Sequence, residues 1–191
     1  MNYNDLVNIL LRDKPSFLIK ENEDNIFNLI PELKLSKGFK QNTIWHIYDV
    51  YNHILSVIDN VENNKLLRIT AFFHDIGKPF VHYEDELGNG HFKGHWNKSL
   101  EIFNKYKDKF DLSDEEKNII SNLILYHDIR IEKISLEEID NLVNILSKEE
   151  MILLYKIKRS DLLSQNPKFH YMLEDYDIQE KKILSKYKVD L

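Results

Sequence analysis

Apolar residues recur along this chain every three or four positions, the spacing of one face of an α-helix. The first clear stripe consists of Ile47, Val50, Ile54, Val57, Ile58 and Val61. After an Asn63-Asn64 break, a second stripe consists of Leu66, Leu67, Ala71, Phe72 and Ile76. A third set, Leu100, Phe103 and Tyr106, predicts a helix over roughly 94–107. These stripes predict amphipathic helices that pack around a shared core.

Capping boxes mark three further helix starts. In this motif a serine and a glutamate three residues later satisfy each other's backbone N–H groups. The pairs are Ser113 with Glu116, Ser135 with Glu138, and Ser147 with Glu150. Phe80–Gly94 carries three glycines and alternates only loosely, which predicts a loop or short hairpin. No other segment predicts strands, so we expect an all-α helical bundle.

The whole chain, 1–191, is expected to form one domain, because no linker or repeat divides it. An amphipathic helix over 169–188 either caps the bundle or forms a dimer, and the oligomeric state stays open. A net charge of -6 argues against a broad basic nucleic-acid surface. The absence of cysteine excludes a thiol nucleophile and a zinc-thiolate site. With no signal peptide or membrane-length apolar run, we expect a cytoplasmic protein without a membrane partner.

Ligand-type side chains stand where helix patterns end. His46, Asp49 and His53 are spaced to lie on one helical stripe. His74 and Asp75 follow the next helix directly, and both side chains coordinate divalent metals. We expect Gly77 to stop that helix and Lys78 to stand beside the pair, where it either binds phosphate or is an ordinary solvated lysine.

Three further residues extend this set. His95 opens the helix after the glycine-rich stretch, and His127 ends a helix with an apolar face. Asp161 lies on an otherwise apolar helix face, where a carboxylate needs a metal or a cation as partner. Singly, each has an ordinary reading: a capping histidine, a surface histidine, or an Asp161 that pairs with Arg159 or Lys158. Jointly they indicate a metal site, and imidazole with carboxylate does not distinguish between metals.

The order of these residues resembles a known family. His53, His74-Asp75 and Asp161 match the H…HD…D signature of the HD-domain superfamily of metal-dependent phosphohydrolases. Four longer runs are similar to the HD domain of bacterial CCA-adding tRNA nucleotidyltransferases: 45–53 (WHIYDVYNH), 73–79 (FHDIGKP), 91–95 (HFKGH) and 159–167 (RSDLLSQNP). The resemblance spans about 40–168. It includes no nucleotidyltransferase head, so polymerising activity does not carry over.

The resemblance implies a metal centre and its ligands. His53, His74, Asp75 and Asp161 would bind one ion. His95 and His127 would supply a second, which Asp75 would bridge. The resemblance implies one or two divalent ions and does not distinguish between Mn, Ni, Fe, Co, Mg and Zn. His46 and His91 lie either beside these ligands or at the cleft, and a surface role is equally open for both.

The expected activity is phosphate-ester hydrolysis by metal-activated water, since metal ions stabilise charge on phosphoryl oxygens. Asp75 or Asp161 would orient the water, while Lys78, Lys93 and Arg130 would contact substrate phosphates. The substrate is expected to be a nucleotide or the phosphate end of an RNA, with a small nucleotide favoured by the acidic chain. Two alternatives remain: a non-catalytic nucleotide- or RNA-associated binding module, and a lyase or hydratase of the same fold.

Overall fold

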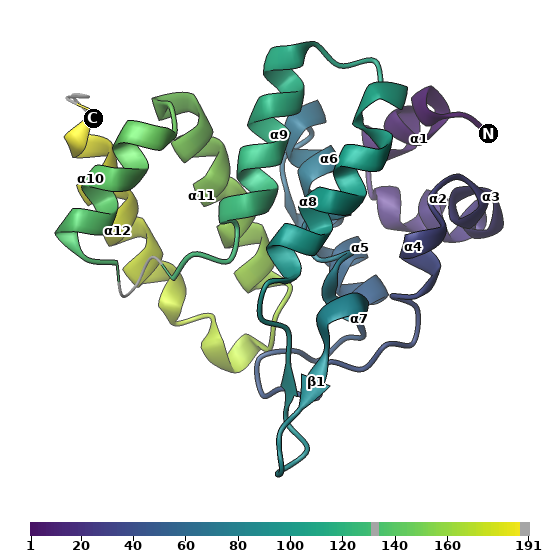
Figure 1. Cartoon of the computed structure of the whole chain (residues 1–191), viewed down its shortest axis with the longest axis horizontal. Coiled ribbons are helices and arrows are strands. Elements are labelled where there is room, and N and C mark those ends of the chain that lie inside the picture. Colours follow the sequence, from purple (N-terminus) through teal and green to yellow (C-terminus); the bar gives the residue numbers. More distant parts are fainter. Residues whose placement is uncertain (131–133, 188–191) are drawn as a thin grey trace.

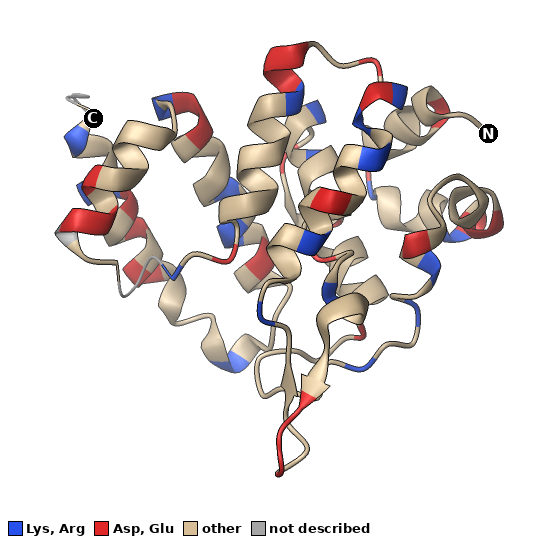
Figure 2. Ribbon diagram, viewed as in Figure 1, with Lys and Arg blue, Asp and Glu red and all other residues tan. Residues whose placement is uncertain are grey.

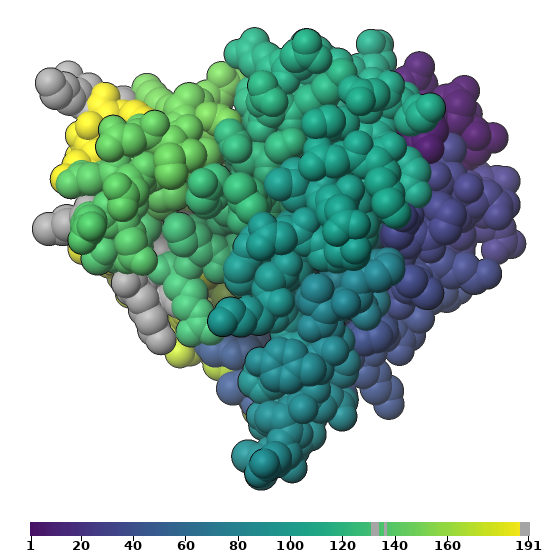
Figure 3. Space-filling model, viewed as in Figure 1, coloured from purple at the N-terminus to yellow at the C-terminus, as the bar shows by residue number. Residues whose placement is uncertain are grey.

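A computed structural model describes residues 1–130 and 134–187 of the chain. Its N-terminal half forms six helices and a short seventh. They are α1 (Tyr3–Leu10), α2 (Pro15–Glu21), α3 (Glu23–Leu29), α4 (Pro31–Lys34), α5 (Val50–Asn60), α6 (Lys65–Phe73) and α7 (Lys78–Val81). A two-stranded antiparallel hairpin follows, with β1 (Tyr83–Glu84) paired to β2 (Gly90–His91). The hairpin projects from the helical body (Figures 1 and 3).

Within the described residues, the elements of the C-terminal half are all helical. Its elements are α8 (His95–Tyr106), the 3-10 turn η1 (Lys107–Lys109), α9 (Asp114–Tyr126), α10 (Leu136–Ile145), α11 (Lys148–Leu163), the 3-10 turn η3 (Pro167–Phe169) and α12 (Met172–Lys186). The all-α bundle and the hairpin near 80–94 are therefore confirmed. Phe80 and Val81 are helical, and residue 188 lies outside the described residues.

Helix α6 is the centre of the bundle. It packs against α1, α5, α8, α9 and α11, and every residue from Leu67 to Phe73 is buried. Because α6 is enclosed, its polar residues Arg68 and Thr70 are buried together with the apolar ones. The end of α6 therefore lies deep inside the molecule, where neighbouring helices can place side chains around it.

The three capping boxes are confirmed. In α9, α10 and α11 the serine hydroxyl accepts the N3 backbone N–H, and the N3 glutamate accepts the serine N–H. Each box determines where a helix begins. In α11, this start determines which residues of the helix face the core, and Asp161 is on that side. In Figure 2, basic and acidic residues are interspersed along the helices, and this view shows no broad basic face. Within the described ranges, no helix combines the length and apolar character needed to cross a bilayer.

One predicted stripe is wrong at its start. Helix α5 begins at Val50, with Asp49 as its cap: the Asp49 carboxylate accepts hydrogen bonds from the N–H groups of Asn52 and Gly38. His46 and Ile47 therefore precede the helix, and Ile47 is exposed. An aspartate with extended backbone geometry is a preferred helix start, so capping overrode the apolar spacing.

The prediction that Gly77 stops a helix is also wrong. Helix α6 ends earlier, with His74 at its C-cap, and Gly77 precedes α7 with an ordinary negative φ. Its missing side chain serves packing instead: a Cβ here would lie 2.6 Å from both the His95 carbonyl oxygen and the Ser99 nitrogen. Gly77 N–H also donates to Ser99 Oγ. This close approach brings the start of α8 against the segment 74–78.

Candidate metal centre

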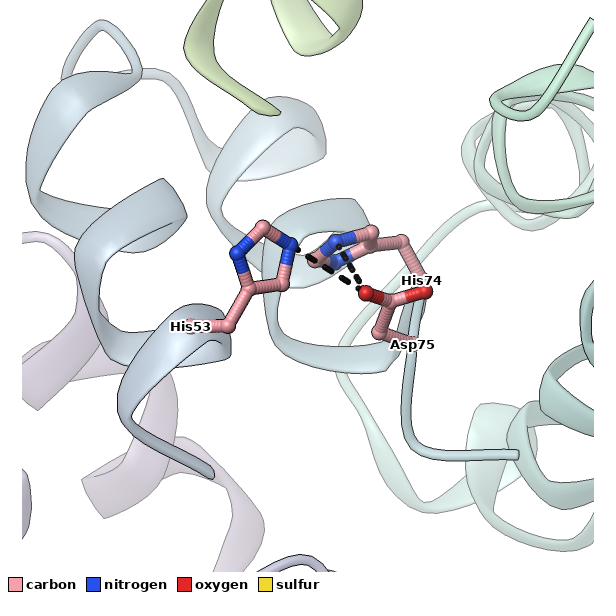
Figure 4. A group of neighbouring side chains, drawn as sticks. All are labelled: His53, His74 and Asp75. Atoms are coloured by element: carbon pink, nitrogen blue, oxygen red, sulfur yellow. Dashed lines mark ion pairs between the residues drawn. The ribbon is translucent and has the colours of Figure 1, made fainter. Parts of the chain in front are cut away.

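The Asp75 carboxylate lies between two pairs of histidines. Its Oδ2 is 3.2 Å from His53 Nε2 and 3.4 Å from His74 Nε2. Its Oδ1 is 3.2 Å from His95 Nε2 and 3.6 Å from His127 Nε2. In Figure 4, His53 and His74 both direct a ring nitrogen at the same oxygen of Asp75. A carboxylate with each oxygen facing its own histidine pair has the arrangement of a ligand that bridges two cations.

The four histidines are oriented alike. In each ring, Nδ1 faces a main-chain carbonyl oxygen, at Ala71 for His74 (2.8 Å), Phe92 for His95 (2.9 Å), Ile124 for His127 (2.7 Å) and Ser164 for His53 (3.4 Å). A proton on Nδ1 leaves the Nε2 lone pair free towards Asp75. Metal-binding histidines are commonly held in this way, by a hydrogen bond from the other ring nitrogen.

The donor atoms fit a divalent metal. One group is formed by His53, His74 and Asp75 and another by Asp75, His95 and His127, and within each group the donor atoms lie within 4.8 Å of one another. Within the described part of the chain, the buried Nε2 atoms of His53 and His74 have carboxylate oxygens within 3.4 Å but form no hydrogen bond of good geometry. A buried polar atom without a partner is costly, and a coordinated metal would remove that cost. Imidazole and carboxylate suit several first-row divalent ions.

Asp161 extends the first group from α11. Its Oδ1 lies 2.9 Å from His53 Nε2, and its side chain is 20% exposed, whereas His53 is fully buried. The carboxylate also accepts a hydrogen bond from Gln165. The predicted alternatives for Asp161 do not occur: Arg159 pairs with Asp177, and Lys158 Nζ donates to the carbonyls of His127 and Ile129.

The centre keeps its carboxylates ionised. Burial opposes ionisation, but Lys78 and the neighbouring histidines hold the pKa of Asp75 well below its ordinary value. His53 in the same way holds the pKa of Asp161 low. Burial would lower the pKa of His53, yet the nearby Asp161 and Asp75 carboxylates raise it to about 9. The two carboxylates therefore favour a positive charge at His53.

Lys78 lies inside the centre and does not extend into solvent. Its side chain is 6% exposed, and Nζ is 2.7 Å from Asp75 Oδ2 and 2.9 Å from Gln41 Oε1. The ammonium also lies 3.5 Å from His46 Nε2 and over the Phe92 ring. The reading of Lys78 as an ordinary solvated lysine is therefore wrong. It neutralises part of the charge that Asp75 brings into the core.

Two hollows open onto the centre. The hairpin hollow, of about 670 Å³, is lined by Lys78, His95 and residues of the hairpin. The α12 hollow, of about 400 Å³, is lined by His127, Asp161 and residues around α12. Both share the residues Trp45, His46, Asp128 and Arg130. Three of the candidate ligands, His95, His127 and Asp161, therefore line these hollows.

The outlying predicted residues lie around these hollows. Lys93 and Arg130 are exposed, and both line the hairpin hollow, while Arg130 also lines the α12 hollow. His91 lies in the same wall, where it pairs with Asp85 at 2.9 Å. His46 lies beside the ligands, with its ring centroid 4.8 Å from that of His53. The structure thus brings these residues to the cleft, but not into the ligand cluster.

Sequence reasoning missed two residues that shape the site. Gln41 is buried and accepts the Lys78 hydrogen bond, but an isolated glutamine in an irregular segment carries no motif signal. Trp45 lines both hollows and stacks on Phe169 at 3.9 Å. Asn166 fixes this segment by donating its backbone and side-chain N–H groups to the carbonyls of Trp45 and Ile44. Contacts over 120 residues of separation are not readable from local spacing.

Comparison with known proteins gives one family. Residues 43–158, more than half of the chain, match the family model described as HD domain. The matched region contains both histidine pairs and Asp75, and it ends three residues before Asp161. A comparison with curated proteins found no match.

Proposed function

The chain belongs to the HD domain family, and we propose that it is a metal-dependent phosphohydrolase acting on nucleotides or on phosphate ends of nucleic acid. The observation that carries the proposal is the Asp75 carboxylate, whose two oxygens face separate pairs of histidines. Such a centre suits hydrolysis of an anionic ester, in which negative charge accumulates on the phosphoryl oxygens.

The residues that would hold the metal are His53, His74, Asp75 and Asp161 on one side, with His95 and His127 on the other. When bound, a divalent ion polarises a phosphoryl group and lowers the pKa of water towards neutrality. The Nδ1 contacts of the four histidines to main-chain carbonyls keep the rings from rotating away. Preorientation of this kind reduces the entropy that ligand binding would otherwise cost.

Asp161 is suited to orient the attacking water. It is ionised, because its pKa is held low, and it is the most exposed of the six candidate ligands. A carboxylate at the edge of the α12 hollow can accept a hydrogen bond from a water molecule and direct its lone pair at phosphorus. Asp75 is enclosed by the histidines and Lys78, so it is less suited to contact the water.

In this proposal, three positively charged side chains contact the substrate phosphate. Lys93 and Arg130 are exposed in the cleft walls and can reach non-reacting phosphate oxygens. Lys78 lines the hairpin hollow from below and can share its ammonium between Asp75 and one phosphate oxygen. Arginine is well suited to this task because its planar group can bind two oxygens at once.

The test combines metal content with activity. Purified wild-type protein, the double variant His74→Ala/Asp75→Ala and the control His170→Ala are analysed for metals. Each is then assayed on bis(p-nitrophenyl) phosphate and 2′,3′-cyclic AMP with Mn²⁺, Ni²⁺ or Mg²⁺. We expect metal and hydrolysis in wild type and control, and neither in the double variant. Absence of metal from wild type after reconstitution would refute the proposal. Metal without hydrolysis would favour a binding role.

A further inference from the structure

Two adjoining cavities lead to the candidate centre. Lys78 and His95 face the hairpin hollow, of about 670 Å³, while His127 and Asp161 face the α12 hollow, of about 400 Å³. Both volumes lie in the range of about 300–1,000 Å³ that is typical of small-molecule sites. His95 Nε2 and His127 Nε2 are only 3.0 Å apart, so the two hollows meet at the centre itself.

This arrangement distinguishes between classes of phosphate ester. A monoester carries one organic group, and a single cavity beside the centre would accommodate it. A linear diester carries two organic groups on one phosphorus, and it needs space for both beside the centre. The two hollows, with Arg130 and Trp45 lining both, match the second case.

The hairpin hollow has aromatic walls. Tyr83, Phe92 and Trp96 line it together with Trp45. The Tyr83 ring stacks on His91 with centroids 5.0 Å apart and planes 17° from parallel, yet 53% of the residue is exposed. An anchored but exposed ring is a platform on which a planar base can stack. Lys93 in the same wall adds positive charge beside this platform.

The α12 hollow is more polar. It contains Gln165, Tyr171, Asp175 and Tyr176, in addition to Asp161 and Arg130. Carboxylate, amide and hydroxyl groups can pair with sugar hydroxyls, which act as both donors and acceptors. Both hollows contain aromatic and polar side chains, but the stacked and exposed Tyr83 ring belongs to the hairpin hollow. This indicates a ligand whose aromatic ring lies in the hairpin hollow and whose hydroxyl-rich group lies in the α12 hollow.

We propose that the substrates are linear phosphodiesters that join two nucleosides, with the base of one stacked in the hairpin hollow against Tyr83. The second nucleoside occupies the α12 hollow through its sugar. Water adds its oxygen to phosphorus, the ester P–O bond breaks, and the departing alcohol takes up a proton, which gives one nucleoside and one nucleoside monophosphate. This inference rests on the proposed function, because it names the substrate class of the same centre.

The first experiment compares substrates on the metal-loaded wild-type protein. The linear dinucleotide adenylyl-(3′→5′)-adenosine is compared with adenosine 5′-phosphate, adenosine 3′-phosphate and 2′,3′-cyclic AMP by chromatography of the products. We expect kcat/KM for the dinucleotide to exceed that for every other substrate by about 10-fold. All four substrates carry an adenine that can stack, but only the dinucleotide has a second nucleoside for the α12 hollow, where the hydrogen bonds of its sugar are worth about this factor.

The second experiment locates the base. Two dinucleotides that each lack one base are compared with the complete dinucleotide, using wild type, Tyr83→Ala and Tyr83→Phe. In wild type, loss of one particular base lowers kcat/KM about 10-fold. In Tyr83→Ala, the ratio of kcat/KM with this base to kcat/KM without it falls to about 1. In Tyr83→Phe the ratio is restored, because the aromatic ring is present again. Phe17→Ala, which removes another exposed aromatic residue outside both hollows, keeps the wild-type ratio.

The outcomes separate this inference from the proposed function. A preference for a monophosphate or for 2′,3′-cyclic AMP would overturn the diester assignment and leave the phosphohydrolase standing. An unchanged ratio in Tyr83→Ala, with metal content and thermal unfolding as in wild type, would overturn the placement of the base. Hydrolysis of none of these substrates by protein that holds its metal would overturn the proposed function together with the inference.

Discussion

Replacing Lys78 by methionine tests how charge is balanced at the centre. The Lys78 ammonium is almost fully buried, and three groups surround it: Asp75 Oδ2, Gln41 Oε1 and His46 Nε2. Methionine keeps most of the side-chain volume but removes the charge. In the metal-free protein, the variant leaves the buried Asp75 carboxylate without its closest cation, and we expect it to be strongly destabilised.

The magnitude depends on metal. Removing one partner of a buried ion pair costs about 3–5 kcal/mol, because the remaining charge stays desolvated. With a divalent ion bound, Asp75 retains a positive neighbour, and the loss should fall to about 1 kcal/mol, the net value of one hydrogen bond. The thermodynamic cycle then requires tighter metal binding by the variant. A difference of about 3 kcal/mol corresponds to roughly 100-fold in affinity.

Urea unfolding followed by circular dichroism measures both quantities, in EDTA and with excess Mn²⁺, and isothermal titration measures metal affinity. Lys98→Met is the matched control. Lys98 pairs with Glu101 at 2.8 Å on the surface, and its removal should cost less than about 1 kcal/mol in either condition. Equal destabilisation of Lys78→Met with and without metal, or unchanged metal affinity, would refute the charge-balance argument.

Three further predictions concern single contacts. Gly77→Ala should lose about 1–3 kcal/mol of stability, measured by urea unfolding, and bind metal more weakly, because its Cβ meets backbone atoms of α8; Gly88→Ala, with open space around it, should keep wild-type metal affinity. Burial alone would raise the pKa of Glu32, but hydrogen bonds from Lys105 and Tyr106 hold this pKa below its ordinary value. Glu32 therefore contributes stability above its unfolded pKa of 4.5 that is lost as pH falls, so Glu32→Gln should show a shallower loss of unfolding free energy between pH 6 and pH 3. Asn166→Ala, which removes the hydrogen bond to Ile44, should raise KM with metal content unchanged, since Trp45 and His46 lose one anchor.

The sequence was sufficient to predict most of the helices. Serine–glutamate capping boxes depend on neighbours three residues apart, and all three were correct. The histidine and aspartate positions at helix ends could also be read, because apolar periodicity shows where a helix face points. His74, Asp75, His95 and His127 all lie buried where that reasoning expected ligand-type residues.

Features that depend on distant segments were not predictable. Lys78 was expected either to bind phosphate or to be a solvated lysine. It is not solvated, because Gln41 and His46 approach it from a segment more than thirty residues away. Gly77 looked like a helix stop, but the close approach of α8 explains it. The narrower resemblance to the HD domain of CCA-adding enzymes stays a prediction, as does the cytoplasmic location.

The centre draws on the whole bundle. His53 comes from α5, His74 and Asp75 from the end of α6, His95 from the start of α8, His127 from the end of α9 and Asp161 from α11. An ion held by these residues would connect the buried α6 with four helices around it, α5, α8, α9 and α11. A ligand that binds only the folded protein stabilises it by RT ln(1 + [L]/Kd), about 2.7 kcal/mol at a hundredfold excess over Kd. Metal loss should therefore lower stability as well as activity, and the helix ends around α6 should be the first backbone to gain hydrogen exchange.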